Sequence, residues 1–482
     1  MSMKKVLQYY RSTSVVAKAT LWFVICSVLQ KSISLITTPI FTRMMSTAQY
    51  GQFSLYNSWL QIFTIITTLR LNGAVFNKGM SLYKDDRESY TSTMQIISFC
   101  LAILCSIIYL IFRDAFNGLT DFPTYVMIAL FVELAFTPAI DFWTVKKRYE
   151  YQYRTVVYRT ISMAVINAIL GIVLVYYSQE KGYARILSCV FVNLCFGLIL
   201  FFSNLKNSKT WFKVEYARFA IVFNIPLLLH YFSQYILDQF DRIMVQKMVS
   251  TAAAGIYSVA YNVGLLLRIV TTSINNALVP WQYEKLEKKE YKRLDDTMFA
   301  IFCFVAACSV LLTCMAPEIM RILADKEYYE GVYVIPPVAI GLFFSFVYTL
   351  FANIEFYYNA NKFSMYISAA GAATNVLLNY IGIKMFGYIA AAYTTLICYV
   401  LFALGHYIYT MRCLRKADKN ANLFQSNRLI ILSAGVIIFG LLISFTYDQI
   451  LLRYGIILCV GGVLIWKKNV LLNTLRSIRK KT

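Results

Sequence analysis

Charged residues are scarce in this chain of 482 residues, and acidic residues are scarcer than basic ones. Asp, Glu, Lys and Arg together make up 15% of the sequence, whereas an average soluble domain carries about 25%. Hydrophobic residues make up 59%, and the mean hydropathy is +0.58. This composition excludes an ordinary soluble protein and indicates a membrane protein.

The formal net charge of +22, from 46 basic and 24 acidic residues, does not indicate nucleic-acid binding. Most of the lysines and arginines, 31 of 46, lie in the loops and termini on one side of the expected membrane, and 10 lie in loops on the other side. The tendency of cytoplasmic loops to carry positive charge already explains this distribution. Such loops are also suited to contact the anionic heads of membrane lipids, which we expect as partners.

Sequence signatures of catalysis and of cofactor binding are absent. The chain has no Walker A phosphate-binding loop, no HExxH motif, no zinc-ligand spacing and no GxSxG nucleophile motif. Its eleven cysteines are scattered without a CxxC pair, and they read as apolar fillers. The longest loop on the outer side, about 317–331, is too short to form an acceptor and donor site for a glycan polymerase. We therefore expect a carrier without a cofactor, not an enzyme.

Apolar segments long enough to span a bilayer occupy nearly the whole chain. A span needs about 20 mostly apolar residues, and it must be helical because lipid offers its backbone no hydrogen bonds. Fourteen segments qualify: 15–38, 53–75, 93–112, 122–143, 157–177, 184–202, 220–238, 253–280, 297–316, 332–352, 364–383, 388–411, 428–447 and 451–466. The sequence thus predicts an all-α polytopic membrane protein with about 14 transmembrane helices.

A loop sequence in the first half of the chain returns in the second half. Ser46–Ser54 reads STAQYGQFS, and Ser250–Ser258, 204 residues later, reads STAAAGIYS. Both copies lie between two apolar segments. A repeat on this scale is typical of transporters whose halves move about a central site. The landmarks of the two copies are Arg43 and Gly51 in the first, and Arg242 and Gly255 in the second.

The distribution of positive charge orients the chain with both termini on the cytoplasmic side. Six spans per half is an even number, so both halves have the same orientation and form a parallel repeat. We accordingly expect a first six-helix bundle in 1–219, a second in 220–427, and two extra helices with a basic cytoplasmic tail in 428–482.

Three cations lie deep inside expected spans, where a charge costs about 2.5–3.5 kcal/mol. They are Lys31, Arg70 and Arg268. Two other span cations, Lys18 and Arg159, lie near cytoplasmic helix ends from which they can reach water. Because the deep cations outnumber the deep acids, we expect them to line a cavity for an anionic cargo. Phosphate or diphosphate suits arginine best, since the guanidinium binds two phosphate oxygens at once.

A second group of ionisable residues could couple transport to an ion. Glu133 is the one acid expected at mid-membrane, and Asp238 follows a span that contains His230 and Pro226. Proline bends a helix, and bent helices beside ionisable groups are common around transport sites. A hydrogen bond at a helix interface is an alternative role for His230, and an ion pair with Arg242 is an alternative role for Asp238.

Short motifs spread along the chain resemble those of Wzx-type polysaccharide flippases, members of the multidrug/oligosaccharidyl-lipid/polysaccharide exporter superfamily. The resemblance covers nearly the whole chain, and the order and spacing of the motifs carry it. The motifs are Pro39-Ile40-Phe41-Thr42-Arg43, Ser46, Tyr50-Gly51, Phe76-Asn77-Lys78-Gly79-Met80, Gly255-Ile256-Tyr257, Asn361-Lys362 and Gly387-Tyr388-Ile389-Ala390-Ala391-Ala392.

The resemblance implies two six-helix bundles around a cationic central cavity, with two extra C-terminal helices. It implies a bacterial inner-membrane protein that moves undecaprenyl-diphosphate-linked oligosaccharides from the cytoplasmic to the outer leaflet. These units would build O-antigen (the glycan of lipopolysaccharide), capsule or exopolysaccharide. A polymerase and a chain-length regulator are the implied protein partners.

Other functions stay open at the level of sequence. A flippase for lipid II or teichoic-acid precursors would use the same physics with another cargo. A drug antiporter of the same superfamily would need mainly acidic and apolar cavity residues, which the excess of cations disfavours. A membrane glycan polymerase is disfavoured by the short outer loops.

Overall fold

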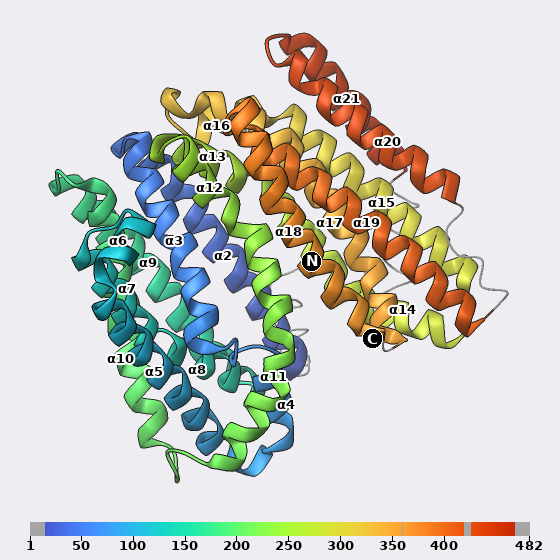
Figure 1. Ribbon diagram of the computed structural model, residues 1–482. Coiled ribbons are helices and arrows are strands. Elements are labelled where there is room, and N and C mark those ends of the chain that lie inside the picture. The colour runs from blue at the N-terminus through green and yellow to red at the C-terminus, as the bar shows by residue number, and fades with distance from the viewer. Residues whose placement is uncertain (1–14, 359, 419–425, 468–482) are drawn as a thin grey trace, which may run out of the picture. The chain divides into compact units, whose positions relative to one another are not determined.

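The computed structural model describes residues 15–358, 360–418 and 426–467, and within these ranges every regular element is a helix (Figure 1). Eleven described helices are long and apolar enough to cross a membrane, and Ile450–Trp466 is a shorter apolar helix. The prediction of an all-helical, multi-pass membrane protein is confirmed.

The chain forms two compact units, residues 1–235 and 236–482. The helices of the first unit are α2 (Val15–Met44), α3 (Thr47–Thr68), α4 (Ala74–Leu82), η1 (Lys84–Asp86), α5 (Arg87–Ile111), α6 (Arg113–Thr120), α7 (Thr124–Phe136), α8 (Pro138–Tyr149), α9 (Tyr153–Tyr177), α10 (Lys181–Lys206) and α11 (Val214–Tyr235). Helix α11, which the sequence places in the second repeat, packs on α3, α4 and α5. The division at 235/236 reflects how compactly the residues pack and does not test where a duplicated unit begins. The repeat boundary at 219/220 therefore stays a prediction.

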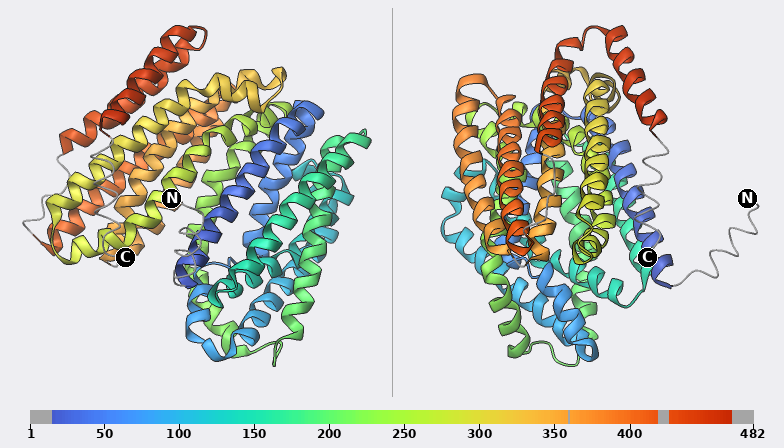
Figure 2. Two further views of the ribbon diagram at one scale, coloured as in Figure 1. Left: turned by 180° about the vertical axis from the view of Figure 1, so that it is seen from behind. Right: turned by 90° about the vertical axis from the view of Figure 1, so that its right-hand side faces the viewer.

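The second unit contains its own bundle and a C-terminal helical hairpin, α20–α21 (red in Figures 1 and 2), which packs on α15 and α17. Its helices are η2 (Ile236–Phe240), α12 (Asp241–Met248), α13 (Thr251–Gly264), α14 (Leu266–Glu287), α15 (Tyr291–Cys314), α16 (Ala316–Leu323), η3 (Lys326–Val334), α17 (Ile335–Tyr357), α18 (Asn361–Phe386), α19 (Ala390–Ala417), α20 (Ser426–Leu442), η4 (Ile443–Thr446) and α21 (Ile450–Trp466).

The two repeated loops begin helices in the same way. The Ser46 hydroxyl accepts a hydrogen bond from the backbone N–H of Gln49, and the Gln49 side chain accepts one from the Ser46 N–H, which completes a capping box on α3. The Ser250 hydroxyl accepts from the Ala253 N–H at the start of α13. Each serine satisfies backbone donors that the first turn of a helix leaves free.

Several expected spans consist of two helices in succession. The segment 122–143 is divided between α7 and α8, and the second begins at Pro138, where a proline needs no backbone donor. The segment 253–280 is divided between α13 and α14 at Leu265. The segment 53–75 ends earlier than predicted, because α3 stops at Thr68. Hydropathy detects the apolar length but not these interruptions.

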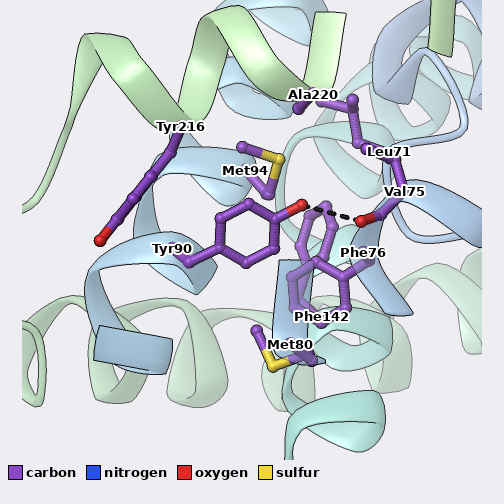
Figure 3. Packing of buried hydrophobic residues seen from close by; sticks show 9 residues of the cluster. All are labelled: Leu71, Val75, Phe76, Met80, Tyr90, Met94, Phe142, Tyr216 and Ala220. Atoms are coloured by element: carbon purple, nitrogen blue, oxygen red, sulfur yellow. Dashed lines mark hydrogen bonds between the residues drawn. The ribbon is translucent and has the colours of Figure 1, made fainter. Parts of the chain in front are cut away.

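An aromatic core in the first unit holds α4 against α5, α8 and α11 (Figure 3). Phe76 lies between the rings of Tyr90 and Phe142, with centroid distances of 5.5 and 4.9 Å. The Tyr90 hydroxyl donates a hydrogen bond of 3.0 Å to the Val75 carbonyl (Figure 3). A β-carbon on Gly79 would lie 2.1 Å from the Tyr90 ring, so only glycine fits there. This core fixes the turn that precedes α4.

Candidate functional site

The turn between α3 and α4 carries Arg70 in an unusual backbone conformation. Leu69 and Arg70 have φ angles of 46° and 57°, in the left-handed region that glycine usually occupies at helix ends. The Arg70 N–H donates to the Thr68 hydroxyl at 3.1 Å. The Asn224 side chain of α11 donates to the Leu69 carbonyl. These contacts stabilise a turn that is costly for branched or long side chains and is common at functional sites.

Two tyrosines of α11 lie against the Arg70 guanidinium. Its central carbon is 5.9 Å from the ring centroid of Tyr231 and 5.3 Å from that of Tyr235. No carboxylate among the described residues lies within salt-bridge distance of it, and the side chain is partly exposed. Cation–π contacts hold the group in place but leave its hydrogen-bond donors available for a ligand.

Two further arginines surround the same region of the first unit. Asp141 of α8 accepts a hydrogen bond of 2.8 Å from Asn72, and it interacts electrostatically with Arg70, Arg148 and Arg159. We call Arg70, Arg148 and Arg159, grouped about Asp141, the arginine cluster. Its three cations exceed its one acid, so the cluster as a whole attracts anions.

Aromatic rings position the other two arginines of the cluster. Arg159 lies over Trp143 at 4.4 Å and donates to the Thr144 hydroxyl, while Arg148 lies over Phe23 at 5.2 Å. Sequence reasoning set Arg159 aside as a helix-end cation and placed Arg148 in a loop. One sequence pattern could have suggested the arginine cluster. Arginines recur along consecutive helices, and each has an aromatic residue nearby in sequence.

Lys31 does not share these contacts. It is exposed on α2, and no hydrogen bond or ion pair between described residues engages its ammonium group. Its role as a cargo ligand stays a prediction that depends only on its depth within a predicted span.

Arg268 differs from Arg70 because it is neutralised within its own unit. Its Nη2 and Nη1 donate to the two carboxylate oxygens of Asp238 at 2.8 and 3.3 Å. Asp238 lies in the π-helical turn η2, a type of irregularity that is frequent at functional sites. The sequence alternative paired Asp238 with Arg242, but Arg242 donates instead to the Asp238 carbonyl and to Gln239, both at 2.8 Å. Cargo binding by Arg268 stays a prediction.

The second unit buries a further acid that sequence reasoning did not single out. Asp241 is fully buried and accepts hydrogen bonds from the Tyr257 hydroxyl at 2.6 Å and from the Arg242 N–H at 2.9 Å. The Arg242 guanidinium lies 4.5 Å from the ring of Tyr261. Among the described residues, the hydrogen bonds to Asp241 thus come from a tyrosine hydroxyl and a backbone N–H, while the Arg242 side chain has other partners.

Within the part of the chain that the structure describes, Glu133 of the first unit has neutral partners only. It is 1% exposed, and its two oxygens accept hydrogen bonds from the Tyr56 hydroxyl at 2.6 Å and from the Asn193 amide at 2.5 Å. No Lys, Arg or His of the described chain lies within 4.0 Å of it. A buried carboxylate without a cation is costly, so this position favours uptake of a proton or a cation.

The two histidines have different surroundings. His230, the predicted coupling residue, is half-buried on α11 beside Tyr231, with ring centroids 6.1 Å apart. His406 of α19 is buried, and its Nδ1 lies 3.0 Å from both oxygens of Glu355 of α17. The Thr410 hydroxyl donates to the same carboxyl group. This pair links two helices of the second unit.

A fully buried arginine attaches the C-terminal hairpin. Arg453 of α21 donates 2.9 and 2.7 Å hydrogen bonds to the Cys314 carbonyl and to the carboxylate of Glu318. Partial burial alone would raise the pKa of Glu318, but the hydrogen bond from Arg453 holds that pKa below its ordinary value.

Comparison with protein families shows which family this chain belongs to. The family profile described as "Polysaccharide biosynthesis protein" matches residues 16–285, and the profile "MatE" matches residues 226–381. "Lsg locus putative protein 1" of Haemophilus influenzae is 24% identical over 364 residues, which are 72% of this chain and 86% of that protein. "Probable low-salt glycan biosynthesis flippase Agl15" of Haloferax volcanii is 20% identical over 413 residues, 82% of this chain and 83% of its own length.

The fold agrees with this placement. The solved structure "Lipid II flippase MurJ, inward closed conformation" superposes with a TM-score of 0.67 at 14% identity, covering 94% of this chain and 100% of that one. The chain therefore belongs to the polysaccharide biosynthesis protein family, within the multidrug/oligosaccharidyl-lipid/polysaccharide exporter superfamily.

Proposed function

We propose that this protein is a flippase that carries lipid-linked glycans across the membrane, with the arginine cluster holding the phosphate groups of the cargo. Family membership supports the reaction class. The observation that supports the site is Arg70, an arginine in a strained turn without a carboxylate partner among the described residues. The related proteins are named as flippases or biosynthesis proteins, which agrees with a carrier role.

The physics of the cargo requires such a site. A diphosphate and its sugars cannot enter hydrocarbon unaided, because charge and unpaired hydroxyl groups are costly there. Arginines replace the hydration of phosphate with charge-assisted hydrogen bonds. Asp141 and Asn72 limit the repulsion among the arginines before cargo arrives. The lipid tail stays in the bilayer throughout, and no covalent bond is made or broken.

The finer identity of the cargo is part of the proposal. We infer an undecaprenyl-diphosphate-linked repeat unit of O-antigen, capsule or exopolysaccharide, moved from the cytoplasmic to the outer leaflet of a bacterial inner membrane. Both termini would then lie in the cytoplasm, and a polymerase and a chain-length regulator would use the product outside. Lipid II or a teichoic-acid precursor would bind through the same phosphate chemistry.

The test is deletion of the gene in its host, followed by extraction of polyprenyl-linked glycans and an assay of the leaflet that holds them. The expected result is one complete repeat unit that faces the cytoplasm, with surface polymer lost. The mass of the unit then identifies the cargo. Accumulation on the outer face would instead indicate a polymerase, and unchanged glycans would indicate a small-molecule exporter.

Complementation of the deletion strain tests the site. Arg70→Ala should fail to restore surface polymer at normal protein level, while Arg70→Lys should restore part of it. Arg113→Ala is the matched control, since this exposed arginine of the same unit is paired with Asp114 at 2.9 Å outside the cluster. Full restoration by Arg70→Ala would refute the role of the cluster.

Among the three predicted coupling residues, we propose Glu133 as the group that couples transport to a proton. It is buried and has no cationic neighbour within 4.0 Å in the described chain, whereas Asp238 is ion-paired with Arg268. A proton removes the charge of Glu133 when the site is dry, and exposure to water releases the proton again. Asp238 and His230 stay open as alternatives.

Glu133→Gln tests the coupling in proteoliposomes with an imposed pH gradient. The variant should translocate cargo at a rate that no longer responds to the gradient. Glu180→Gln, which changes an exposed carboxyl group of the same unit, should respond like the parent protein. A normal gradient response in Glu133→Gln would exclude Glu133 as the coupling group.

A further inference from the structure

Helix α9 has an exposed face on the side opposite its packed face. Val156 and Met163 pack into a core cluster with Trp143. The other side of α9, together with Trp22 of α2, lines an open groove of about 770 Å³; the α9 residues are Arg154, Val157, Tyr158, Ile161, Ser162, Val165 and Ile166. The helical spacing of three and four residues separates these two faces. The groove is therefore distinct from the arginine cluster, which α9 joins through Arg159.

The lining of the groove changes character along its length. Arg154 lies at one end, and Tyr158, Ile161, Val165 and Ile166 follow it along the helix. Tyr158 is 78% exposed, and Ile166 is 45% exposed. The groove thus has a cationic end and an apolar body. This combination matches a ligand with one anionic group and a hydrocarbon chain.

The groove has the depth of one membrane leaflet. Helix α9 begins at Tyr153, one residue before Arg154. From Arg154 to Ile166 an α-helix rises about 18 Å, and half of the hydrocarbon core of a bilayer is about 15 Å thick. Arg154 therefore lies at the level of lipid headgroups, while Ile166 lies near the bilayer centre.

No acidic residue of the described chain neutralises the cationic end of the groove. No hydrogen bond or ion pair between described residues engages Arg154, which is exposed. Nearby, Lys147 is already paired with Glu150 at 2.7 Å. Arg148, over Phe23, adds positive charge on the same side of the membrane. The charge of Arg154 is thus available to a phosphate.

We propose that this groove is a binding site for one anionic phospholipid. Its phosphate accepts hydrogen bonds from Arg154, and one acyl chain lies along Tyr158, Ile161 and Val165. A long polyprenyl chain is a poorer match, because the groove ends at mid-span, whereas an acyl chain fills one leaflet. By positive-inside orientation, this leaflet is the cytoplasmic one. The bound lipid covers the exposed side of the α2–α9 pair.

Native mass spectrometry of the purified full chain measures this binding directly. The protein is delipidated and titrated with phosphatidylglycerol, and in parallel with zwitterionic phosphatidylcholine. We expect one phosphatidylglycerol to bind tightly and phosphatidylcholine to bind weakly. Arg154→Ala should weaken phosphatidylglycerol binding about tenfold, the scale of one charge-assisted hydrogen bond. Arg154→Lys should keep most of the affinity.

Matched variants separate the groove from general effects on the protein. Ser162→Trp fills the groove and should abolish tight binding, whereas Val173→Trp, on the same helix but outside the groove, should not. Arg218→Ala removes another exposed arginine, on α11, and should also have no effect. Gel filtration confirms that every variant remains monodisperse.

Three results would overturn the proposal. The first is equal binding of phosphatidylglycerol and phosphatidylcholine. The second is unchanged phosphatidylglycerol binding in both Arg154→Ala and Ser162→Trp, which would mean that another ligand or segment of the chain occupies the groove. The third is a loss of polyprenyl-phosphate binding, but not of phosphatidylglycerol binding, in these variants, which would assign the groove to the carrier lipid. None of these measurements depends on flippase activity.

Discussion

Arg70 of the first unit and Arg268 of the second, both predicted from depth in a span, have different partners. In the first unit, Arg70 has no carboxylate within 4.0 Å among the described residues, and Glu133 has only neutral hydrogen-bond donors. In the second unit, Arg268 donates to both oxygens of Asp238. The two arginines therefore differ in whether a carboxylate of the described chain neutralises them.

This difference assigns different roles to similar residues. A paired charge is already satisfied, so its removal affects mainly the folded state. An unpaired charge gains its full interaction only when a ligand or a proton arrives. The first unit is therefore the better candidate for cargo and proton binding, whereas the charges of the second unit contribute more to its own structure.

The largest expected effect separates Arg70 from Arg268. Arg70→Ala should lower the translocation rate about a hundredfold, which corresponds to losing roughly 3 kcal/mol of phosphate binding, with unchanged protein level. Arg268→Ala should instead lower the stability by about 1 kcal/mol, since this pair is partly exposed. The double variant Arg268→Ala/Asp238→Asn should recover that stability and retain transport. Equal transport defects in both single variants, at equal stability, would remove the contrast between the units.

The ion pair of Arg453 with Glu318 tests whether a paired charge of the second unit stabilises the fold, because its contribution to stability depends on pH. Because the pKa of Glu318 is lower in the folded state, its stabilising effect is present above the unfolded pKa of about 4.3 and is lost as pH falls below it. The parent protein should lose thermal stability as the pH falls below about 4.3, partly for this reason. Arg453→Ala should cost about 2 kcal/mol at pH 7 and should reduce that pH dependence. An unchanged pH profile would contradict a stabilising role of this pair.

The smallest expected effects concern the repeated loops. Ser46→Ala and Ser250→Ala should each lower stability by about 1 kcal/mol, the usual value of a helix N-cap. Ser46→Ala should cost more, because it also breaks the reciprocal capping box with Gln49. Thermal melts in one detergent compare the two variants, and Ser54→Ala, beyond both caps, is the control. A larger loss in Ser250→Ala would show that the single cap matters more than the box.

The sequence predicted the helices far better than their interruptions. Hydropathy predicted long apolar helices because the bilayer requires them, and eleven of the described helices are long and apolar enough to cross it. The end of α3 at Thr68 was missed because Leu69 and Arg70, which carry no glycine-like signal, adopt the left-handed conformation there. Contacts from Thr68 and Asn224 impose this turn, and Asn224 is distant in sequence.

The candidate site was predicted only in part, because its contacts also join residues that are distant in sequence. Depth within a span singled out Arg70 and Glu133, but it gave equal weight to Arg268. The partner of Arg268, Asp238, lies 30 residues away in sequence, and helical periodicity does not pair positions at that distance. Arg148 and Arg159 joined the site only through the packing of α2, α8 and α9.

By itself, the sequence determined the membrane class, the helices and the duplicated loop landmarks, because these depend on composition, span length and local capping. Only the tertiary structure decided which buried charges are neutralised and which remain available. Pairing of charges depends on distances of a few ångströms between helices, and hydropathy along the chain carries no information about such distances.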